Sequence, residues 1–335
     1  MGRTADQSFV SVVVSFRNEC KHLRAHIRAL LRQEYPKDKY EIVFIDDGST
    51  DSSLQIAKEE MPAKNSPSMK IIHLDWIGTG GARNVGIRES KGEIVAITDA
   101  DALPDPSWIS EISDSLRDRK IGIVCGRIKE VPGLDQPLQE LEQTTYEKTY
   151  WFVNVAISRK VFEKTGGFDK RFRRGSDYDV IVRAVNAGYE CRYNPKAIVW
   201  HLKPQLSLSK SLKAELKNGE ADLLFLFVDG KIFLRNLMKL PTSVRLAVAN
   251  TVAELIFGPL LVLAFLLAGL QGLLVAAVPI ALFVLLRAYV SKARKFRLLR
   301  ALACIPIGFA LWYYVFRLLP HAFEKRPLET RFPIE

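Results

Sequence analysis

The chain has 335 residues, 48% hydrophobic and 25% charged, and this length accommodates two domains. Its formal net charge of +11 is uneven: residues 206–335 hold 17 Lys/Arg and 8 Asp/Glu, whereas residues 1–205 hold 31 and 29. The basic residues separate apolar runs and do not form one patch with aromatic residues, which argues against a nucleic-acid partner. The four cysteines lack metal-ligand spacing, so we expect reduced thiols and no zinc site.

The first hundred residues alternate predicted strands and helices. VSVVVSF at 10–16 is an apolar, β-branched run that predicts a strand buried on both faces, and the apolar spacing within 22–33 predicts a helix. The alternation continues with EIVFI at 41–45, SLQIAKEEM at 53–61, MKIIHL at 69–74, ARNVGIRES at 82–90 and EIVAIT at 93–98. Strands that alternate with helices imply right-handed crossovers and a parallel sheet, so the predicted fold class is α/β.

The next hundred residues predict a mixed continuation of that sheet. IGIVCGRI at 121–128 and WFVNVAIS at 151–158 predict two further strands, and residues 137–150 are expected to be helical.

Three acidic clusters come directly after apolar runs of β type. They are Asp46 with Asp47, Asp99 with Asp101, and Asp177 with Asp179. Ligands bind outside the carboxyl ends of the strands in an open parallel sheet, so these carboxylates are expected to converge on one crevice. So many negative charges held together need a positive partner, and a divalent cation that bridges a diphosphate is the natural candidate.

Six motifs in order resemble glycosyltransferase family 2 over residues 8–203. They are SVVVSFRNE, DDGSTD, GTGGARNVGI, TDADALPDPSW, GGFDKRFRRGSDYDVIVRAVNAGY and VWH. The resemblance implies an inverting enzyme with the GT-A fold, a Rossmann-like mixed sheet that binds a nucleotide-diphosphate sugar. It also implies Mn²⁺ or Mg²⁺ as cofactor.

The resemblance assigns roles to individual residues. Glu19 and Asp47 would contact the base and ribose of the donor, and Arg83 would lie beside the base. Asp99 and Asp101 match the family's D-x-D signature, in which one carboxylate serves the ribose and the other the metal. Local chemistry offers alternatives, because DDGSTD is also good turn and helix-cap sequence and D-A-D also suits a plain strand-end turn.

Three more residues complete the expected site. His201 would finish the metal site as the family's late histidine, although a histidine after a strand is often structural. Asp177 would be the general base that removes the proton of the acceptor hydroxyl. The alternative is that it only interacts with the dipole at a helix N-terminus, a role that suits Asp179 better. Asn154, with Trp151, would border the donor sugar.

The chain departs from the family pattern at two positions. Ser15 stands where the family usually has proline, which is expected to affect loop rigidity more than chemistry. Ser176 replaces the acid that usually precedes the base, so Asp177 loses a like-charged neighbour, a departure that bears on the type of acceptor. GTGGARNVG also resembles a dinucleotide-binding loop, but it comes after about 70 residues and not after the first strand, as such a site requires.

The C-terminal part is predicted to associate with a membrane. In residues 231–239, Lys231, Arg235 and Lys239 recur every four residues opposite apolar side chains, which predicts a basic amphipathic helix in the interface plane, or a helix packed on the catalytic domain. Apolar segments at 246–268, 271–289 and 301–319 are each near the ~20 residues that span a bilayer. Glu254 is either a functional polar residue of the first span or a sign that this span begins later.

The predicted organisation is a GT-A domain at 1–205, interface helices at 206–245, three transmembrane helices at 246–320 and a tail at 321–335. Basic loops of membrane proteins stay on the cytoplasmic side, so the loop at 287–300 predicts that it and the catalytic domain are cytoplasmic. The chain is then expected to be a multi-pass protein of the cell membrane with its C-terminus outside. The expected function is transfer of a sugar to a lipid-linked or membrane-associated glycan acceptor. The alternatives are a polyprenyl-phosphate glycosyltransferase, a processive polysaccharide synthase and a membrane scaffold with a degenerate transferase domain. The processive synthase is disfavoured because no Q-x-x-R-W motif comes after GSDYD.

Overall fold

A computed structural model of the chain describes residues 7–62, 66–131, 146–148, 152–172, 176–202 and 208–241, with 244–245, 248–249, 252–253 and 256. Contacts divide the chain into two compact units. The first comprises Met1–Pro204, Arg235–Pro241 and Arg326–Glu335, and the second comprises Gln205–Leu234 and Thr242–Lys325.

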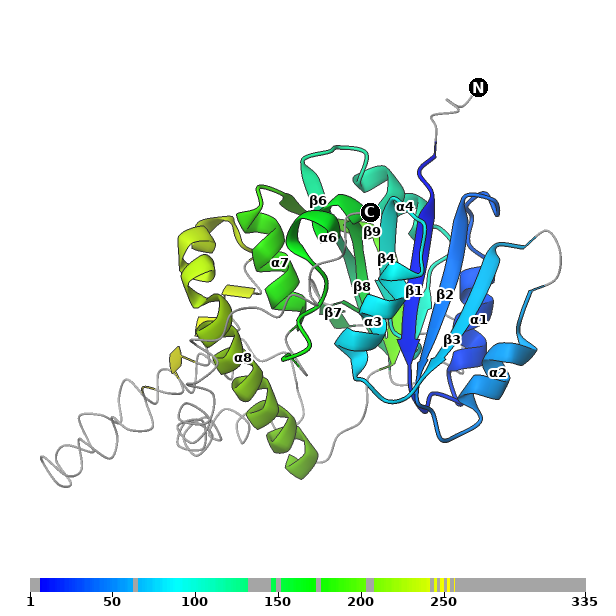
Figure 1. Ribbon diagram of the computed structural model, residues 1–335, viewed down its shortest axis with the longest axis horizontal. Coiled ribbons are helices and arrows are strands. Elements are labelled where there is room, and N and C mark those ends of the chain that lie inside the picture. The colour runs from blue at the N-terminus through cyan, green and yellow to red at the C-terminus, as the bar shows by residue number, and fades with distance from the viewer. Residues whose placement is uncertain are drawn as a thin grey trace, which may run out of the picture. The chain divides into compact units, whose positions relative to one another are not determined.

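The described part of the first unit contains one nine-stranded sheet in the order β3-β2-β1-β4-β8-β6-β9-β5, with β7 paired to β6 (Figure 1). The strands are β1 (Val10–Phe16), β2 (Tyr40–Asp47), β3 (Ser68–Leu74), β4 (Ile94–Thr98), β5 (Ala102–Pro104), β6 (Ile121–Val131), β7 (Tyr146–Lys148), β8 (Asn154–Ser158) and β9 (Glu190–Leu202). The helices between them are α1 (Leu23–Leu31), α2 (Ser53–Glu59), α3 (Thr79–Arg88), α4 (Trp108–Ser115), α6 (Arg159–Thr165) and α7 (Ser176–Asn186).

The first half of the sheet is parallel, as the alternation of strands and helices predicts. β1 pairs in parallel with β2 and β4, so that Val12 lies opposite Ile42 on one side and Ala96 on the other, and β2 pairs in parallel with β3. Past β4 the sheet becomes mixed, since β8 is antiparallel to β4 and to β6, whereas β9 is parallel to β6. The predicted α/β class with a mixed sheet is therefore confirmed.

The predicted helix at 137–150 is wrong where the structure describes it. Residues Tyr146–Lys148 form β7, antiparallel to β6 at Ile128–Glu130. β8 pairs with β6 only up to Cys125, so the last part of β6 would present a bare edge on that side, and β7 covers it. The remainder of 137–150 lies outside the described residues.

Helices cover both faces of the sheet. One face of β1, formed by its alternate apolar residues from Val10 to Phe16, packs in one core with buried side chains of α1, α2 and α4. α3 crosses the opposite face so closely that a Cβ on Gly86 would lie 2.4 Å from Cγ1 of Val13. Because side chains alternate along a strand, Ser11, Val13 and Ser15 share this α3 face.

The long helix α8 (Leu208–Asn236) precedes a 3-10 turn, Leu237–Lys239. The expected amphipathic helix at 231–239 is thus the end of a longer helix together with this turn. Lys231, Arg235 and Lys239 are exposed as expected, but of the apolar residues opposite them Phe233 is buried and Met238 is 82% exposed.

Within the part of the chain that the structure describes, no helix has both the length and the apolar character to cross a membrane. The spans expected at 271–289 and 301–319 and the tail at 321–335 lie outside the described residues, as does most of the span at 246–268, including Glu254.

Candidate active site

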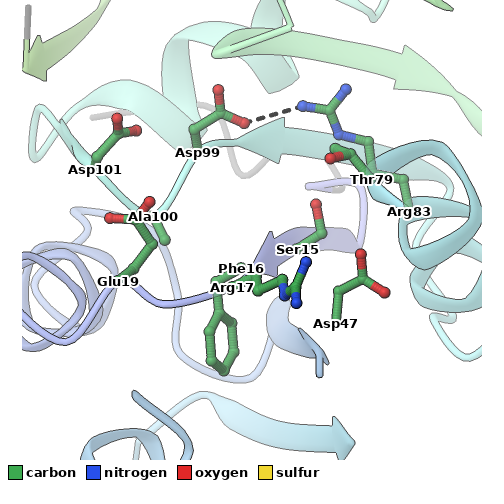
Figure 2. Close-up of a pocket in the computed structure, with 10 residues that line it drawn as sticks. All are labelled: Ser15, Phe16, Arg17, Glu19, Asp47, Thr79, Arg83, Asp99, Ala100 and Asp101. Atoms are coloured by element: carbon green, nitrogen blue, oxygen red, sulfur yellow. Dashed lines mark hydrogen bonds and ion pairs between the residues drawn. The ribbon is translucent and has the colours of Figure 1, made fainter. Parts of the chain in front are cut away.

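A polar pocket opens at the carboxyl ends of β1, β2 and β4. It is lined by Ser15, Phe16, Arg17, Glu19, Asp47, Thr79, Arg83, Asp99, Ala100 and Asp101 (Figure 2). Five of the residues expected to bind donor or metal therefore share one pocket, because parallel strands bring the loops after them to the same edge of the sheet.

Three potential metal ligands converge at one end of the site. Asp99, Asp101 and His201 each offer one ligand atom, and these atoms lie within 4.8 Å of one another. His201 reaches the D-A-D turn because β9 pairs antiparallel with β5, which places it opposite Ala102. Its Nε2 lies 3.4 Å from Oδ1 of Asp101. Two carboxylates and an imidazole suit Mn²⁺, and the oxygen ligands suit Mg²⁺.

The electrostatics of this group show an excess of negative charge. Burial, and then the charge of Asp101, raise the pKa of Asp99, although Arg83 opposes them. Burial also acts to raise the pKa of Asp101, but its hydrogen bond and ion pair with His201 lower it overall. Desolvation opposes protonation of His201, yet the bond with Asp101 raises the pKa of its imidazole. Burial is the main cause of the raised pKa of Asp99, and a cation between these groups would relieve the smaller contribution, the repulsion from Asp101.

Asp46 and Asp47 are adjacent in sequence but have different surroundings. Asp46 is fully buried, where it accepts a hydrogen bond from Ser49 N at 3.0 Å and contacts Nδ1 of His73 at 2.7 Å. Asp47 lines the pocket, and its Oδ1 accepts a hydrogen bond from Ile77 N at 2.8 Å. The turn role thus belongs to Asp46, whereas Asp47 lies in the pocket and its contact with the donor stays a prediction.

Arg83 connects the helix α3 to the D-A-D turn. Its Nη2 donates to Oδ1 of Asp99 at 3.0 Å, and its guanidinium lies 5.6 Å from the ring centre of Phe168. The residue is 6% exposed, and its buried Nε has no hydrogen-bond partner among the described residues.

The loop that carries Glu19 is held against the loop after β2. Asn18, with a φ of 57°, accepts a hydrogen bond from Thr50 N at 2.8 Å, and Glu19 N donates to Ser53 Oγ at 2.8 Å. The Glu19 carboxylate lies 3.3 Å from Nδ1 of His22. Burial, and more weakly the charges of Asp101 and Asp99, raise the pKa of Glu19.

Asp177 lies in the first turn of α7 and is not one of the pocket-lining residues. Its Oδ2 lies 3.4 Å from Phe152 N, and its charge is close enough to help raise the pKa of Asp99. Asp179, in contrast, is fully buried in a two-point ion pair with Arg183, at 3.0 and 2.6 Å. Asp177, the other acid of GSDYD, forms no ion pair with an arginine in the described part of the chain.

Asn154 lies in the interior, opposite Thr98 of β4, and is not one of the pocket-lining residues. It is fully buried at the start of β8, where its Oδ1 accepts from Trp108 Nε1 at 2.8 Å. Its Nδ2 donates to the carbonyl oxygens of Arg127 and Ala197, both at 2.9 Å. Both donor hydrogens of the Asn154 amide are thus used within the protein, and its contact with the donor sugar stays a prediction. Trp151 lies outside the described residues.

Sequence reasoning misses three polar residues of the pocket: Ser15, Arg17 and Thr79. Ser15 stands out in the sequence only as a departure from proline. A usable signal exists, because strand alternation puts Ser15 on the α3 face at the last but one position of β1.

Comparison with known proteins agrees with this geometry. The sequence model of the family described as Glycosyl transferase family 2 matches residues 11–174. The matched segment runs from β1 past β8 and contains each pocket-lining residue. This chain is a glycosyltransferase of family 2. Asp177 and His201 lie beyond the matched segment, so their assignment depends on the structure and the sequence motifs.

The relatives of this family 2 enzyme are glycosyltransferases. The chain is 27% identical over 247 residues to glycosyltransferase AglE of Haloferax volcanii, covering 71% of this chain and 80% of that protein. It is 25% identical over 257 residues to a dolichyl N-acetyl-α-D-glucosaminyl phosphate 3-β-D-2,3-diacetamido-2,3-dideoxy-β-D-glucuronosyltransferase of Methanococcus voltae, covering 68% and 80%. The mannosyltransferase PcManGT of Pyrobaculum calidifontis, solved with GDP-Man and Mn²⁺, shares the fold with a TM-score of 0.56 and 19% identity over 95% of this chain and 86% of that one.

Proposed function

We propose that the enzyme moves a sugar, with inversion of the anomeric centre, from a nucleoside-diphosphate sugar to a lipid-linked or membrane-associated glycan acceptor. The observation that carries the proposal is the convergence of Asp99, Asp101 and His201 at one end of a pocket that also holds Asp47 and Arg83. A diphosphate with a divalent cation has the charge pattern that such a pocket requires.

The residues present fit a divalent cation. Their donor set is made of carboxylate oxygens and one imidazole nitrogen, and the pKa of the Asp99 carboxyl is raised although Arg83 lies beside it. Asp101 and His201 would hold Mn²⁺ or Mg²⁺. When bound, the cation neutralises charge on the departing nucleoside diphosphate, which is worth several kcal/mol to such a reaction.

Asp177 is proposed as the base. An inverting displacement requires a proton acceptor on the face of the sugar opposite the leaving group, where the acceptor hydroxyl attacks. Asp177 stands at the N-terminus of α7, close enough to Asp99 for its charge to act on that carboxyl, and Ser176 beside it adds no second negative charge. An ionised Asp177 would take the hydroxyl proton as the new glycosidic bond forms.

The acceptor and location are proposed from relatives and charge. The Methanococcus voltae relative acts, by its name, on a dolichyl-linked phosphosugar. The excess of basic over acidic residues in 206–335 supports contact with anionic membrane lipids. We place the catalytic domain at the cytoplasmic face of a multi-pass membrane protein, because the basic loop at 287–300 favours that side.

Thermal shift with nucleoside diphosphates tests the proposal. Wild-type protein in Mn²⁺ should be stabilised by one or more of UDP, GDP, ADP and CDP, because a ligand that binds only the folded state shifts unfolding by mass action. Asp101→Ala should lose this Mn²⁺-dependent shift, and its melting temperature without ligand should equal that of wild type. Asp114→Ala, which removes an exposed carboxylate on α4, is the control and should behave as wild type. A shift of equal size after complete chelation of metal would contradict the metal-dependent donor site.

A further inference from the structure

Near the end of β1, the polar side chain of Ser15 is neither part of the apolar core nor bonded to the carboxylates of the pocket. Ser15 is partly buried at the last but one position of the strand and lines the pocket. Its hydroxyl makes no hydrogen bond with any residue in the described part of the chain. The family that this chain resembles usually has proline here, and proline would present no hydrogen-bond donor to the pocket.

The position of Ser15 is a consequence of the packing of α3 on the sheet. Ser15 lies on the strand face that Val13 shares, and Gly86 of α3 sits directly on Val13. Thr79 is seven residues before Gly86, which is two helical turns, so the first turn of α3 stands over the strand end that carries Ser15. Figure 2 shows the Ser15 hydroxyl pointing into the pocket, with Thr79 and Arg83 on one side and Asp47 below.

The two ends of the pocket differ in chemistry. Asp101 and Glu19 lie at the end away from Thr79, and Asp101 is the carboxylate that His201 joins (Figure 2). Asp101 and His201 would hold a divalent cation there, and its charge would favour the diphosphate at that end. The opposite end offers an acceptor in the Asp47 carboxylate and a donor group in the Arg83 guanidinium, of which Nη2 is bonded to Asp99. A nucleoside, which presents both donors and acceptors, matches this end.

We propose that the Ser15 hydroxyl hydrogen-bonds to the nucleoside of the donor and that Ser15 is therefore a specificity-determining residue of the nucleotide site. A carboxylate only accepts and a guanidinium only donates, whereas a hydroxyl does both and completes the set. The inference rests on the proposed donor class. We expect the consequence to be confined to nucleotide affinity, because Ser15 lies on the side of the pocket toward Asp47 and Thr79 and away from Asp101 (Figure 2).

Isothermal titration with two kinds of ligand tests the inference. In Mn²⁺, wild type, Ser15→Ala and Ser68→Ala are titrated with the nucleoside diphosphate that binds wild type most tightly and, separately, with inorganic pyrophosphate. Ser68 is the matched control, an exposed strand serine at the amino end of β3, on the opposite edge of the sheet. Both variants should fold, since neither substitution introduces bulk or removes a hydrogen bond within the described residues.

Ser15→Ala should bind the nucleoside diphosphate about 3- to 10-fold more weakly, the loss typical of one neutral hydrogen bond, and bind pyrophosphate as wild type does. In turnover with the matching donor sugar, KM should rise by a similar factor while kcat stays within about twofold. Equal affinity of Ser15→Ala and wild type for the nucleotide overturns the inference, and so does an equal loss for nucleotide and pyrophosphate. Failure of wild type to bind any nucleoside diphosphate would refute the proposed donor class instead.

Discussion

At the scale of single residues, neighbouring aspartates in this enzyme have different roles. Asp46 is fully buried and holds a turn, whereas Asp47 lines the pocket. Asp179 is fully buried against Arg183, whereas Asp177 lies 3.4 Å from Phe152 N and forms no ion pair with an arginine of the described chain. In each pair, one carboxylate is fully buried against internal partners, and the other is the one for which we propose a role in binding or catalysis.

Substitution of the proposed base gives the sharpest test at this scale. Asp177→Asn keeps shape and the contact with Phe152 N but cannot accept a proton. We expect donor binding within about twofold of wild type and a loss in kcat of roughly 10²–10⁴, the usual contribution of a general base. Steady-state turnover and nucleotide titration on the same preparation check this. A kcat loss below about tenfold would mean that another group accepts the proton.

At the scale of elements, α1 contributes a buried histidine to the support of the D-A-D turn. His26 is fully buried, and its Nδ1 donates to the carbonyl oxygen of Ala102 at 2.5 Å. Desolvation lowers the pKa of His26 to about 4. The residue after Asp101 is therefore anchored by a neutral imidazole.

This burial predicts a pH-dependent stability. His26 has the higher pKa in the unfolded state, which therefore binds the proton first as the pH falls. The full contribution of neutral His26 to the free energy of unfolding is present above about pH 6.5. It is lost as the pH drops toward 4, by about 3 kcal/mol in total. His26→Asn removes the titrating group and should flatten this part of the profile relative to wild type. Urea unfolding of both proteins between about pH 4.5 and 7.5 measures the difference. Parallel profiles for the two proteins would show that His26 is not the group responsible.

The helix α7 is fixed by a buried ion pair. Arg183 binds Asp179 at two points and also donates to the carbonyl oxygens of Thr165, Gly166 and Gly167. This arrangement ties the helix that carries Asp177 to the end of α6 and the two residues after it.

Removal of one partner of this pair should be costly. Asp179→Ala leaves a buried guanidinium without its counter-charge and is expected to destabilise the protein by about 3–5 kcal/mol. The exposed pair of Arg117 with Asp114, at 2.7 Å, serves as the comparison, and Arg117→Ala should cost less than about 1 kcal/mol. Chemical denaturation of the two variants decides the point, and similar losses for both would contradict the buried-pair argument.

At the scale of the whole molecule, the acceptor decides whether a base is needed. A lipid phosphate is already ionised at neutral pH, whereas the hydroxyl of a lipid-linked saccharide must lose a proton as it attacks. The presence of Asp177 near Asp99 therefore favours extension of a lipid-linked saccharide over glycosylation of a bare polyprenyl phosphate.

The full-length enzyme in lipid vesicles can distinguish these acceptors. Wild type should transfer sugar to a lipid-linked saccharide, and Asp177→Asn should lose that transfer. Polyprenyl phosphate should be a poor acceptor for both proteins. Efficient transfer to polyprenyl phosphate that survives Asp177→Asn would reverse the assignment of acceptor.

Local patterns in the sequence are sufficient for the α/β class and for most of the pocket. Strand and helix periodicities locate β1 to β4 and the helices between them, and a parallel sheet gathers at one edge the loops that its strands lead into. Glu19, Asp47, Arg83, Asp99 and Asp101 are therefore predictable as neighbours. The membrane spans and the cytoplasmic location stay predictions.

Tertiary structure alone decides the contacts that depend on strand order. His201 is about a hundred residues from Asp101 in sequence, and it joins the site only because β9 pairs with β5. The burial of Asn154 depends on Trp108, Arg127 and Ala197, none of which is local to it. The hydroxyl of Ser15 faces the pocket because α3 stands over the end of β1. Such pairings form between segments far apart in the chain, so the spacing of residues in the sequence does not predict them. Periodicity within one segment predicts only the local element, a helix or a strand.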